Sequence, residues 1–379
     1  MQAWLLLADS LLTKAATALA STRLTWHYRS RHESLISFCN RAFYAGELNT
    51  VPGRKPLRSE PEILVTELPV PKRDRSKVAD LLLDRPVSSH RVEKGTFRNQ
   101  QNEAEAEYVA ELVRALLKKK TGKSIGVVAF SQPQAQAIEQ AINVLAIDDN
   151  WFRNLLEEER ERHDEGQFAG LFVKNLESVQ GDERDIIIVS VGYAPGPDGK
   201  MRMNFGPINQ SGGEKRLNVI FSRAKHHIAI VTSIGPHQIT NDYNIGANTL
   251  KQYLRYAAAA SAGREDEMSD CLNGFGGANI ASPMTRLEES AVVSRIVEQL
   301  AAQGLIAVKG VGYSTLRADI AVKIPDADEF TRAVLVDTEA HYAIPDVVER
   351  YITRPGIFRA FGWEVEQVLG KDSVLRERL

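Results

Sequence analysis

Apolar residues recur along the chain at two spacings, which predict alternating helices and strands. Helical spacing marks residues 2–20, 31–43, 102–119, 133–145, 215–224 and 250–260, and short apolar runs mark strands at 62–70, 125–130, 172–176, 185–193 and 227–232. Residues 71–100 are charged and show few periodic signals. Short, nearly continuous apolar strands that alternate with helices are typical of a parallel sheet buried on both faces. The pattern therefore predicts an α/β domain over residues 1–259.

A second unit is expected after residues 260–282, a polar, acidic and Gly-rich stretch that we interpret as a linker. Beyond it the pattern predicts a small α/β domain over residues 283–379. Its expected helices are 286–303 and 345–360, and its expected strands are 305–309, 318–324, 332–338 and 363–368.

Composition excludes several classes of protein. The net charge of −2 argues against a wholly basic nucleic-acid-binding surface, but it is compatible with a local basic groove. Cys39 and Cys271 are the two cysteines, so we expect neither a disulfide framework nor a cysteine-rich zinc site, and we expect a cytoplasmic location. The Leu- and Ala-rich residues 1–20 favour an amphipathic helix over a signal peptide because Asp9 and Lys14 interrupt them. No membrane partner is expected, since no stretch is apolar for the ~20 residues that cross a bilayer.

Several polar segments occur in a specific order. LTWHYRSRH at 24–32 is followed by FYAGEL at 43–48, FSQPQ at 130–134, VQGDERD at 179–185, RLNV at 216–219 and SRAK at 222–225. In this order the segments resemble the motifs of the second RecA-like domain of superfamily 1 nucleic-acid helicases. The resemblance extends over residues 24–232 and implies a RecA-like parallel-sheet domain with the P-loop NTPase fold, acting as a second motor domain.

The resemblance also implies roles for individual residues. In such motors ATP and Mg²⁺ bind between two RecA-like domains, and arginines of the second domain neutralise charge that develops on the γ-phosphate. Arg29 and Arg223 lie at the two arginine-finger positions, where a planar guanidinium donates two hydrogen bonds to phosphate oxygens. Gly181, Glu183 and Gln134 are expected beside the nucleotide.

The same resemblance places Asn175, Ser178 and Gln180 on the face that follows a nucleic-acid strand. Neutral amides and hydroxyls there contact phosphate and sugar without reading bases, and DNA is favoured over RNA as the partner. Trp26 and Tyr28 are candidates for base stacking, although packing in the core is the simpler explanation for both rings.

The parts of a complete ATP site are not found in the sequence. It contains no G-x-x-x-x-G-K-[ST] loop and no DExx carboxylate pair after a strand. TGKS at 121–124 ends like such a loop, but Leu117 replaces its first glycine, a helix is predicted before it and a strand after it. We therefore expect a first motor domain to be supplied in cis or in trans, and negligible ATP hydrolysis by this chain alone.

The C-terminal unit resembles a small restriction-endonuclease-like domain, related to very-short-patch repair nucleases, at the end of one large bacterial helicase family. The resemblance rests on LEE at 287–289, RADIAV at 317–322, VDTEAHY at 336–342, Arg350 and FGWEV at 361–365. It implies Mg²⁺ held by Glu288, Asp319 and Asp337. It also implies catalytic roles for Asp319, Asp337 and Glu339, the last two on one strand face.

This segment departs from the family pattern. The acid types are swapped, Ala340 replaces a glycine, and no lysine follows at the usual position, so His341 or Arg350 would have to supply the electrophile. Asp319 is also compatible with capping or turning a strand end, and Asp337 with Glu339 is compatible with a solvated alternating face. Three hypotheses therefore stay open: a helicase fragment, a magnesium-dependent nuclease, and a non-catalytic nucleic-acid-binding module of a repair or defence complex.

Overall fold

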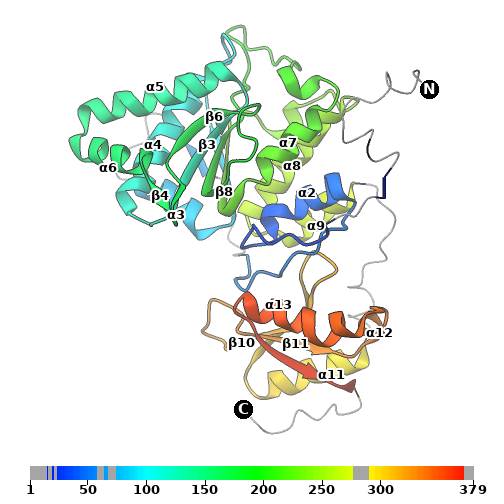
Figure 1. The fold of residues 1–379 in the computed structure, drawn as a ribbon. Helices are drawn as coiled ribbons and strands as arrows, with labels where there is room; N and C mark the ends of the chain where they lie inside the picture. The colour runs from blue at the N-terminus through cyan, green and yellow to red at the C-terminus, as the bar shows by residue number, and fades with distance from the viewer. Residues whose placement is uncertain are drawn as a thin grey trace.

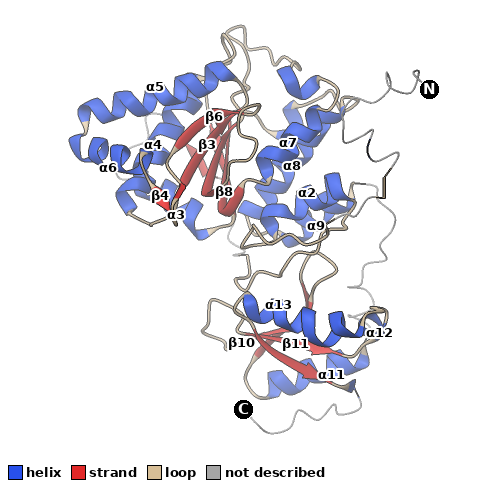
Figure 2. Ribbon diagram, in the orientation of Figure 1, coloured by secondary structure: helices blue, strands red, loops and turns tan. Residues whose placement is uncertain are grey.

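The computed structural model describes residues 24–57, 64–66, 74–275 and 290–370, together with residues 15, 19 and 20. Most strands belong to two sheets, one in an upper and one in a lower unit of the molecule (Figure 2). The helix expected at 2–20 falls almost wholly outside the described residues. Within them, no helix is long and apolar enough to cross a membrane.

The larger unit is built on a six-stranded sheet of order β1-β2-β8-β7-β3-β6, in which all neighbouring strands are parallel. Its strands are β1 (Leu64–Thr66), β2 (Val87–Val92), β3 (Ile125–Ala129), β6 (Phe172–Asn175), β7 (Arg184–Ser190) and β8 (Ala224–Thr232). The predicted parallel α/β sheet is confirmed.

Helices cover both faces of this sheet (Figure 1). One face carries α3 (Arg75–Asp84), α4 (Glu103–Lys119), α5 (Gln132–Asp148) and α6 (Asn150–Arg160); the other carries α2 (Ser34–Tyr44), α7 (Gly213–Phe221), α8 (Ile245–Ser261) and α9 (Glu265–Asn273). The connections contain β4 (His163–Asp164), β5 (Gln167–Phe168) and two 3₁₀ turns, η2 (Gly206–Asn209) and η3 (Pro236–Gln238). Side chains of β7 alternate between the two cores, which explains why its sequence is continuously apolar.

The charged stretch at 71–100 contains α3 and β2, neither of which its pattern predicts. β2 is an interior strand, yet Ser88, Ser89 and His90 lie in it. The His90 ring contacts the Tyr108 hydroxyl at 2.7 Å and the Ser88 hydroxyl at 2.9 Å. Burial lowers the pKa of His90 to about 3, so the ring is neutral. Hydrogen bonding lets these polar groups be buried, and the strand therefore lacks an apolar signature.

The linker expected at 260–282 is wrong over its first half. α9 occupies this stretch and buries Met268, Cys271 and Leu272 against the larger unit. The helix is short, and its first turn is acidic. Acidic side chains stabilise the positive end of a helix dipole, but in the sequence alone the same residues resemble a solvated loop. Residues 276–282 lie outside the described residues.

The smaller unit has a four-stranded sheet of order β12-β11-β10-β9, antiparallel except for the β11–β12 pair. Its strands are β9 (Ile306–Val311), β10 (Ala318–Lys323), β11 (Arg332–Val336) and β12 (Glu364–Val368). α11 (Ala291–Ala302) packs on one face and α13 (Arg354–Ala360) on the other, with α12 (Glu339–Tyr342) and a π-helical turn η4 (Glu349–Thr353) before α13. The unit is α/β as predicted; its likeness to restriction endonucleases stays a prediction.

The chain after α2 connects the two units. The buried Glu33 carboxyl accepts hydrogen bonds from the Thr50 hydroxyl at 2.9 Å and the Tyr313 backbone N–H at 2.7 Å. The Trp363 indole donates to the Pro52 carbonyl at 3.2 Å. Burial raises the pKa of Glu33 to about 7, against the hydrogen bonds that lower it. A titratable carboxyl therefore lies at the junction between the units.

Replacing Met268 by Ala tests whether α9 belongs to the folded core. Because the side chain is fully buried, its removal should lower the free energy of unfolding by about 2–5 kcal/mol. Urea denaturation followed by circular dichroism measures this change. Glu267→Ala, in the same helix but on its exposed face, should change it by no more than about 0.5 kcal/mol. Equally small effects of both substitutions would mean that α9 is not part of the core.

Replacing Glu33 by Gln tests the junction. The raised pKa means that the folded protein holds this proton more tightly than the unfolded chain, so the Glu33 contribution to stability falls as pH rises from about 4.5 to about 7. The variant cannot ionise at this position, so the difference in unfolding free energy between the two proteins should change steadily across that window. Parallel pH profiles would contradict the assignment.

Candidate functional site

The amino ends of β7 and β8 lie side by side, because paired parallel strands begin at the same edge of a sheet. Glu183 directly precedes β7, and Arg223 directly precedes β8. The segment that carries Arg29 runs along the same edge: the Arg31 backbone N–H donates to the Lys225 carbonyl at 2.8 Å. The structure therefore gathers Arg29, Glu183 and Arg223, which lie far apart in sequence.

Two cations share the Glu183 carboxylate. Arg29 Nε donates to Oε2 at 2.5 Å, and Lys225 Nζ lies 3.0 Å from Oε1. Burial by itself would raise the pKa of Glu183, but hydrogen bonds from Lys225 and Arg29 outweigh it and hold the pKa below its ordinary value. The carboxylate is therefore ionised at neutral pH, and it orients the Arg29 guanidinium.

Arg223 lies next to Arg29 in this cluster. Its Nε donates to the Val219 carbonyl at 2.7 Å, while Arg29 Nη1 donates to the Ser222 carbonyl at 3.3 Å. Burial, and then the charge of Arg29, lower the pKa of Arg223. Three cations, with Lys225, thus face one carboxylate. An anion at this place would relieve the repulsion between the guanidinium groups.

Gly181 sets the course of the loop that delivers Glu183. Its φ of +94° is a conformation that side chains disfavour, and a Cβ there would meet no atom within 4 Å. The next residue, Asp182, pairs with Lys174 of β6 at 2.7 Å. The loop at 176–183 therefore crosses from the carboxyl end of β6 to the amino end of β7.

Gln134 does not lie where the resemblance implies. Its side chain is buried, and its amide donates to the Ser190 hydroxyl at 3.0 Å and to the Asn102 carbonyl at 3.2 Å. Its Oε1 accepts the Asn102 backbone N–H at 2.6 Å. These bonds brace the start of α4 against β7, so the expected contact of Gln134 with a nucleotide is wrong.

Asn175 and Ser178 lie together at the opposite edge of the sheet from the arginine cluster. Asn175 ends β6, and its Oδ1 accepts the Ser178 hydroxyl at 2.8 Å and the Ser178 backbone N–H at 3.0 Å. Gln180 is exposed farther along the same loop. Contact of these three residues with a nucleic acid stays a prediction.

The acidic residues of the smaller unit are engaged in the fold. The Asp319 carboxylate accepts the Val336 backbone N–H at 2.7 Å, and burial raises the pKa of Asp319 to about 6. Asp337 accepts hydrogen bonds from the Tyr342 hydroxyl and the Gly370 backbone N–H. These are the contacts of structural carboxylates.

The expected metal site is not assembled among the described residues. Glu339 opens α12 instead of continuing β11, because the strand ends at Val336, so the predicted strand face shared by Asp337 and Glu339 is wrong. Glu288 lies outside the described residues. In the part of the chain that the structure describes, no three His, Cys, Asp or Glu residues lie close enough to hold a metal ion.

Lys225 belongs to the site although no role was predicted for it. It follows Arg223 by two positions at the start of a strand, and side chains two apart on a strand lie on the same side. That spacing is the signal available in the sequence.

The core packing predicted for two aromatic residues is confirmed for Trp26, which contacts the core of the smaller unit, and is wrong for Tyr28, which is 79% exposed.

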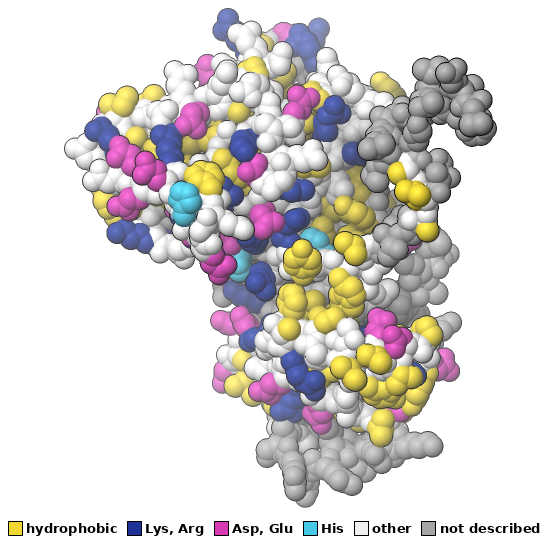
Figure 3. Space-filling view, viewed as in Figure 1, with side chains coloured by type: hydrophobic (Ala, Val, Ile, Leu, Met, Phe, Trp, Pro, Cys, Tyr) yellow, Lys and Arg dark blue, Asp and Glu magenta, His cyan; other side chains and the backbone are white. Residues whose placement is uncertain are grey.

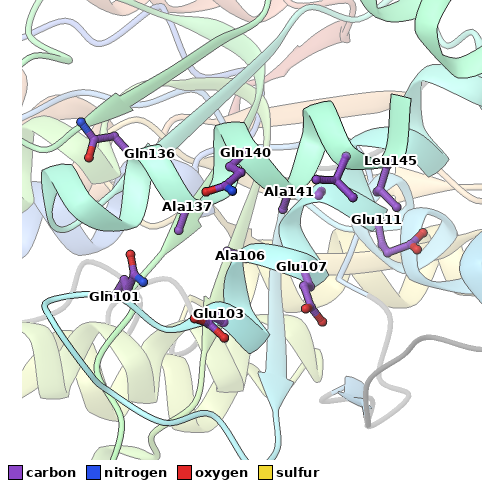
Figure 4. A pocket seen from close by; sticks show the side chains of 12 residues that line it. Gln101, Glu103, Ala106, Glu107, Glu111, Gln136, Ala137, Gln140, Ala141 and Leu145 are labelled. Carbon is purple, nitrogen blue, oxygen red and sulfur yellow. The ribbon is translucent and has the colours of Figure 1, made fainter. Parts of the chain in front are cut away.

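Two cavities elsewhere differ in charge. A cavity of about 570 Å³ lies between α4 and α5, where the carboxylates of Glu103, Glu107 and Glu111 repel phosphate (Figure 4). Several Lys and Arg side chains instead gather where the two units meet (Figure 3). Arg31 and Lys55 line a cavity of about 270 Å³ there. Asp84 and Glu329 line the same cavity, and Asp84 pairs with Lys55 at 3.4 Å, so carboxylates partly balance the cations there.

Replacing Gly181 by Ala should lower the free energy of unfolding by about 1–2 kcal/mol, because the strain is in the backbone and not in a steric clash. Chemical denaturation measures the change. Gly356 provides a matched control, since a Cβ there also meets no atom within 4 Å but the residue lies in α13. Gly356→Ala should leave stability unchanged or raise it by up to about 1 kcal/mol. Equal effects of the two substitutions would contradict the assigned conformation.

Known proteins resemble a large part of this chain. A family model described as an AAA domain matches residues 7–234. An uncharacterized ATP-dependent helicase of Mycoplasma genitalium is 34% identical over 257 residues, which are 65% of this chain and 19% of that protein. Its homolog in Mycoplasma pneumoniae is 34% identical over 246 residues, or 63% of this chain and 18% of that protein. The chain thus spans less than a fifth of the length of these relatives.

Proposed function

Because the chain belongs to the AAA domain family that matches its residues 7–234, we propose that its larger unit is the second RecA-like motor domain of a superfamily 1 nucleic-acid helicase. The observation that carries this proposal is the cluster of Arg29, Arg223 and Lys225 around one carboxylate. Relatives named as ATP-dependent helicases support it.

In this proposal Arg29 and Arg223 contact the γ-phosphate of ATP. The two guanidinium groups are already held side by side, so little reorganisation is needed when negative charge develops between them. Glu183 keeps Arg29 oriented, and Gly181 lets the loop follow its course at this edge. Mg²⁺ would neutralise charge on the phosphates from the side of the first motor domain.

The remaining half of the ATP site would come from a first motor domain, in cis in a longer parent protein or in trans. Two observations support this: the sequence has no phosphate-binding loop, and the relatives are more than five times as long as the matched region. Arginine fingers alone hold neither the phosphates nor the metal ion.

The larger unit is proposed to bind a nucleic-acid strand through Asn175, Ser178 and Gln180, with DNA favoured over RNA. We propose that the smaller unit has a restriction-endonuclease-like fold but serves as a docked module without cleavage. Support comes from Asp319 and Asp337, whose oxygens are bonded within the fold.

ATP turnover tests the arginine assignment. The chain alone should hydrolyse ATP negligibly, and mixing it with a first motor domain of a related ATP-dependent helicase should raise turnover. Arg223→Ala or Arg29→Ala should then lower the stimulated turnover by roughly 10³-fold, the usual effect of removing an arginine finger.

Arg202→Ala provides the control, since this exposed arginine pairs with Asp198 away from the cluster. It should leave the stimulated turnover unchanged. Turnover by the chain alone that disappears in Arg223→Ala would overturn the account of a missing half. Stimulated turnover that survives both cluster substitutions would overturn the arginine assignment itself.

A further inference from the structure

The carboxyl ends of β3 and β7 flank a cavity of about 360 Å³. The connections that follow these neighbouring parallel strands go to opposite sides of the pair. The chain passes from β3 to β6 on one side and from β7 to β8 on the other. α5 after β3 covers one face of the sheet, and α7 after β7 covers the other. Such a divergence opens a crevice beyond the strand ends, and this is where open α/β sheets bind ligands. The arginine cluster, at the amino ends, is a separate site.

Three aromatic rings form the apolar wall of this cavity. The ring centroids of Phe97 and Tyr193 are 5.2 Å apart, and those of Phe130 and Tyr193 are 6.2 Å apart. Phe205 packs against Tyr193 with 4.9 Å between centroids. Phe130 and Tyr193 are almost fully buried in this cluster, whereas Phe97 is half-buried. The cluster thus supports Phe97 from behind and leaves part of its ring surface toward the cavity.

The polar lining is mostly neutral. Amide side chains of Gln100, Gln132, Asn175 and Asn204 contribute to it, and Asn175 Nδ2 donates to Gln132 Oε1 at 2.9 Å. Among the described residues that line it, Glu177 is charged and no Lys or Arg is present. Primary amides both donate and accept hydrogen bonds, as the edges of nucleobases do. The lining therefore suits a base and not a phosphate.

A strained turn carries one side of the wall. Asn99 and Gln100 have φ of 51° and 62°, and the backbone of Arg98 and Gln101 closes the turn with two hydrogen bonds of 3.0 Å. A left-handed conformation is unfavourable for a residue with a Cβ such as Gln100. The Ser131 hydroxyl holds the turn by donating to the Gln100 carbonyl at 2.6 Å. Strain that the surroundings maintain in this way is typical of ligand sites.

We propose that this cavity is a nucleobase pocket, in which a base of single-stranded nucleic acid stacks on Phe97 and hydrogen bonds to the amides of Gln132 and Asn175. The proposal rests on the proposed function, because it assumes that the larger unit binds a strand. Arg98 lies beside Phe97 and lines an adjoining cavity of about 470 Å³ with Lys94 and Glu103, where the two cations would meet phosphates of the strand. A paired base is not free to enter, so the pocket selects single strands.

The base belongs to a strand and not to the ATP of the motor. The arginine cluster is at the amino end of β7 and the pocket at its carboxyl end, so the seven residues of β7 separate them by roughly 20 Å. A nucleotide whose phosphates contact Arg29 therefore places its base elsewhere.

Binding of two labelled strands of equal length tests the pocket: single-stranded oligo-deoxythymidine and an abasic sugar-phosphate strand. Fluorescence anisotropy with the full chain should show about tenfold tighter binding of the base-containing strand, the usual effect of one stacked base. Phe97→Ala should abolish most of this preference. Phe97→Leu keeps an apolar side chain against Tyr193 and should also lose it, which separates stacking from a folding defect.

Trp151→Ala is the matched control, since this half-exposed aromatic lies on α6, away from the pocket, and its loss should leave the preference unchanged. Equal binding of both strands by the unmodified chain would overturn the pocket and leave the helicase proposal intact. No binding of either strand would instead contradict the proposed function. Competition by free AMP that is lost in Phe97→Leu would assign the pocket to a mononucleotide and overturn the strand proposal.

Discussion

The parallel pairing of β7 with β8 is the constraint on which the arginine cluster depends. Arg184 pairs with Ala224, and this register brings the residues before both strands together. Because both strands are buried on both faces, a slip by one residue would turn apolar side chains to the wrong core. Arg29, 154 residues from Glu183, is then added by a backbone bond to β8. Core packing, and not a local motif, holds the guanidinium groups side by side.

The two candidate sites occupy opposite edges of one sheet and share a loop. Asn175, at the wall of the aromatic cavity, begins the stretch that ends at Glu183 beside Arg29. Gly181 and the Lys174–Asp182 ion pair fix the path between them. An anion that competes with Glu183 for Arg29 would change the forces on this loop. The same eight residues, 176–183, therefore connect the two sites along the chain.

Sequence patterns predicted the elements whose signal is apolar and local. β7, β8 and α4 follow from their spacing. β2 does not, because the His90 ring and the Ser89 backbone N–H are bonded to Tyr108 and Ser261, which are distant in sequence. The motif order predicted that Arg29 and Arg223 meet. It misplaced Gln134. A glutamine amide can either contact a ligand or hold buried elements together, and only the fold shows which partners it has. The strand face predicted for Asp337 and Glu339 was wrong for a similar reason. Where β11 ends decides the direction of these side chains, and the fold sets that end.

The smaller unit also supports the arginine cluster. Trp26 packs into its core, and the Arg31 guanidinium lies 5.9 Å from the Phe361 ring centroid. Arg29 lies between these two contacts, in a segment that is bonded to β8 on its other side. A short loop carrying a charged side chain loses conformational freedom when both of its ends are held, so less entropy remains to be lost when the arginine meets an anion. The contact between the units is thus part of what orients Arg29, whether or not the smaller unit cleaves nucleic acid.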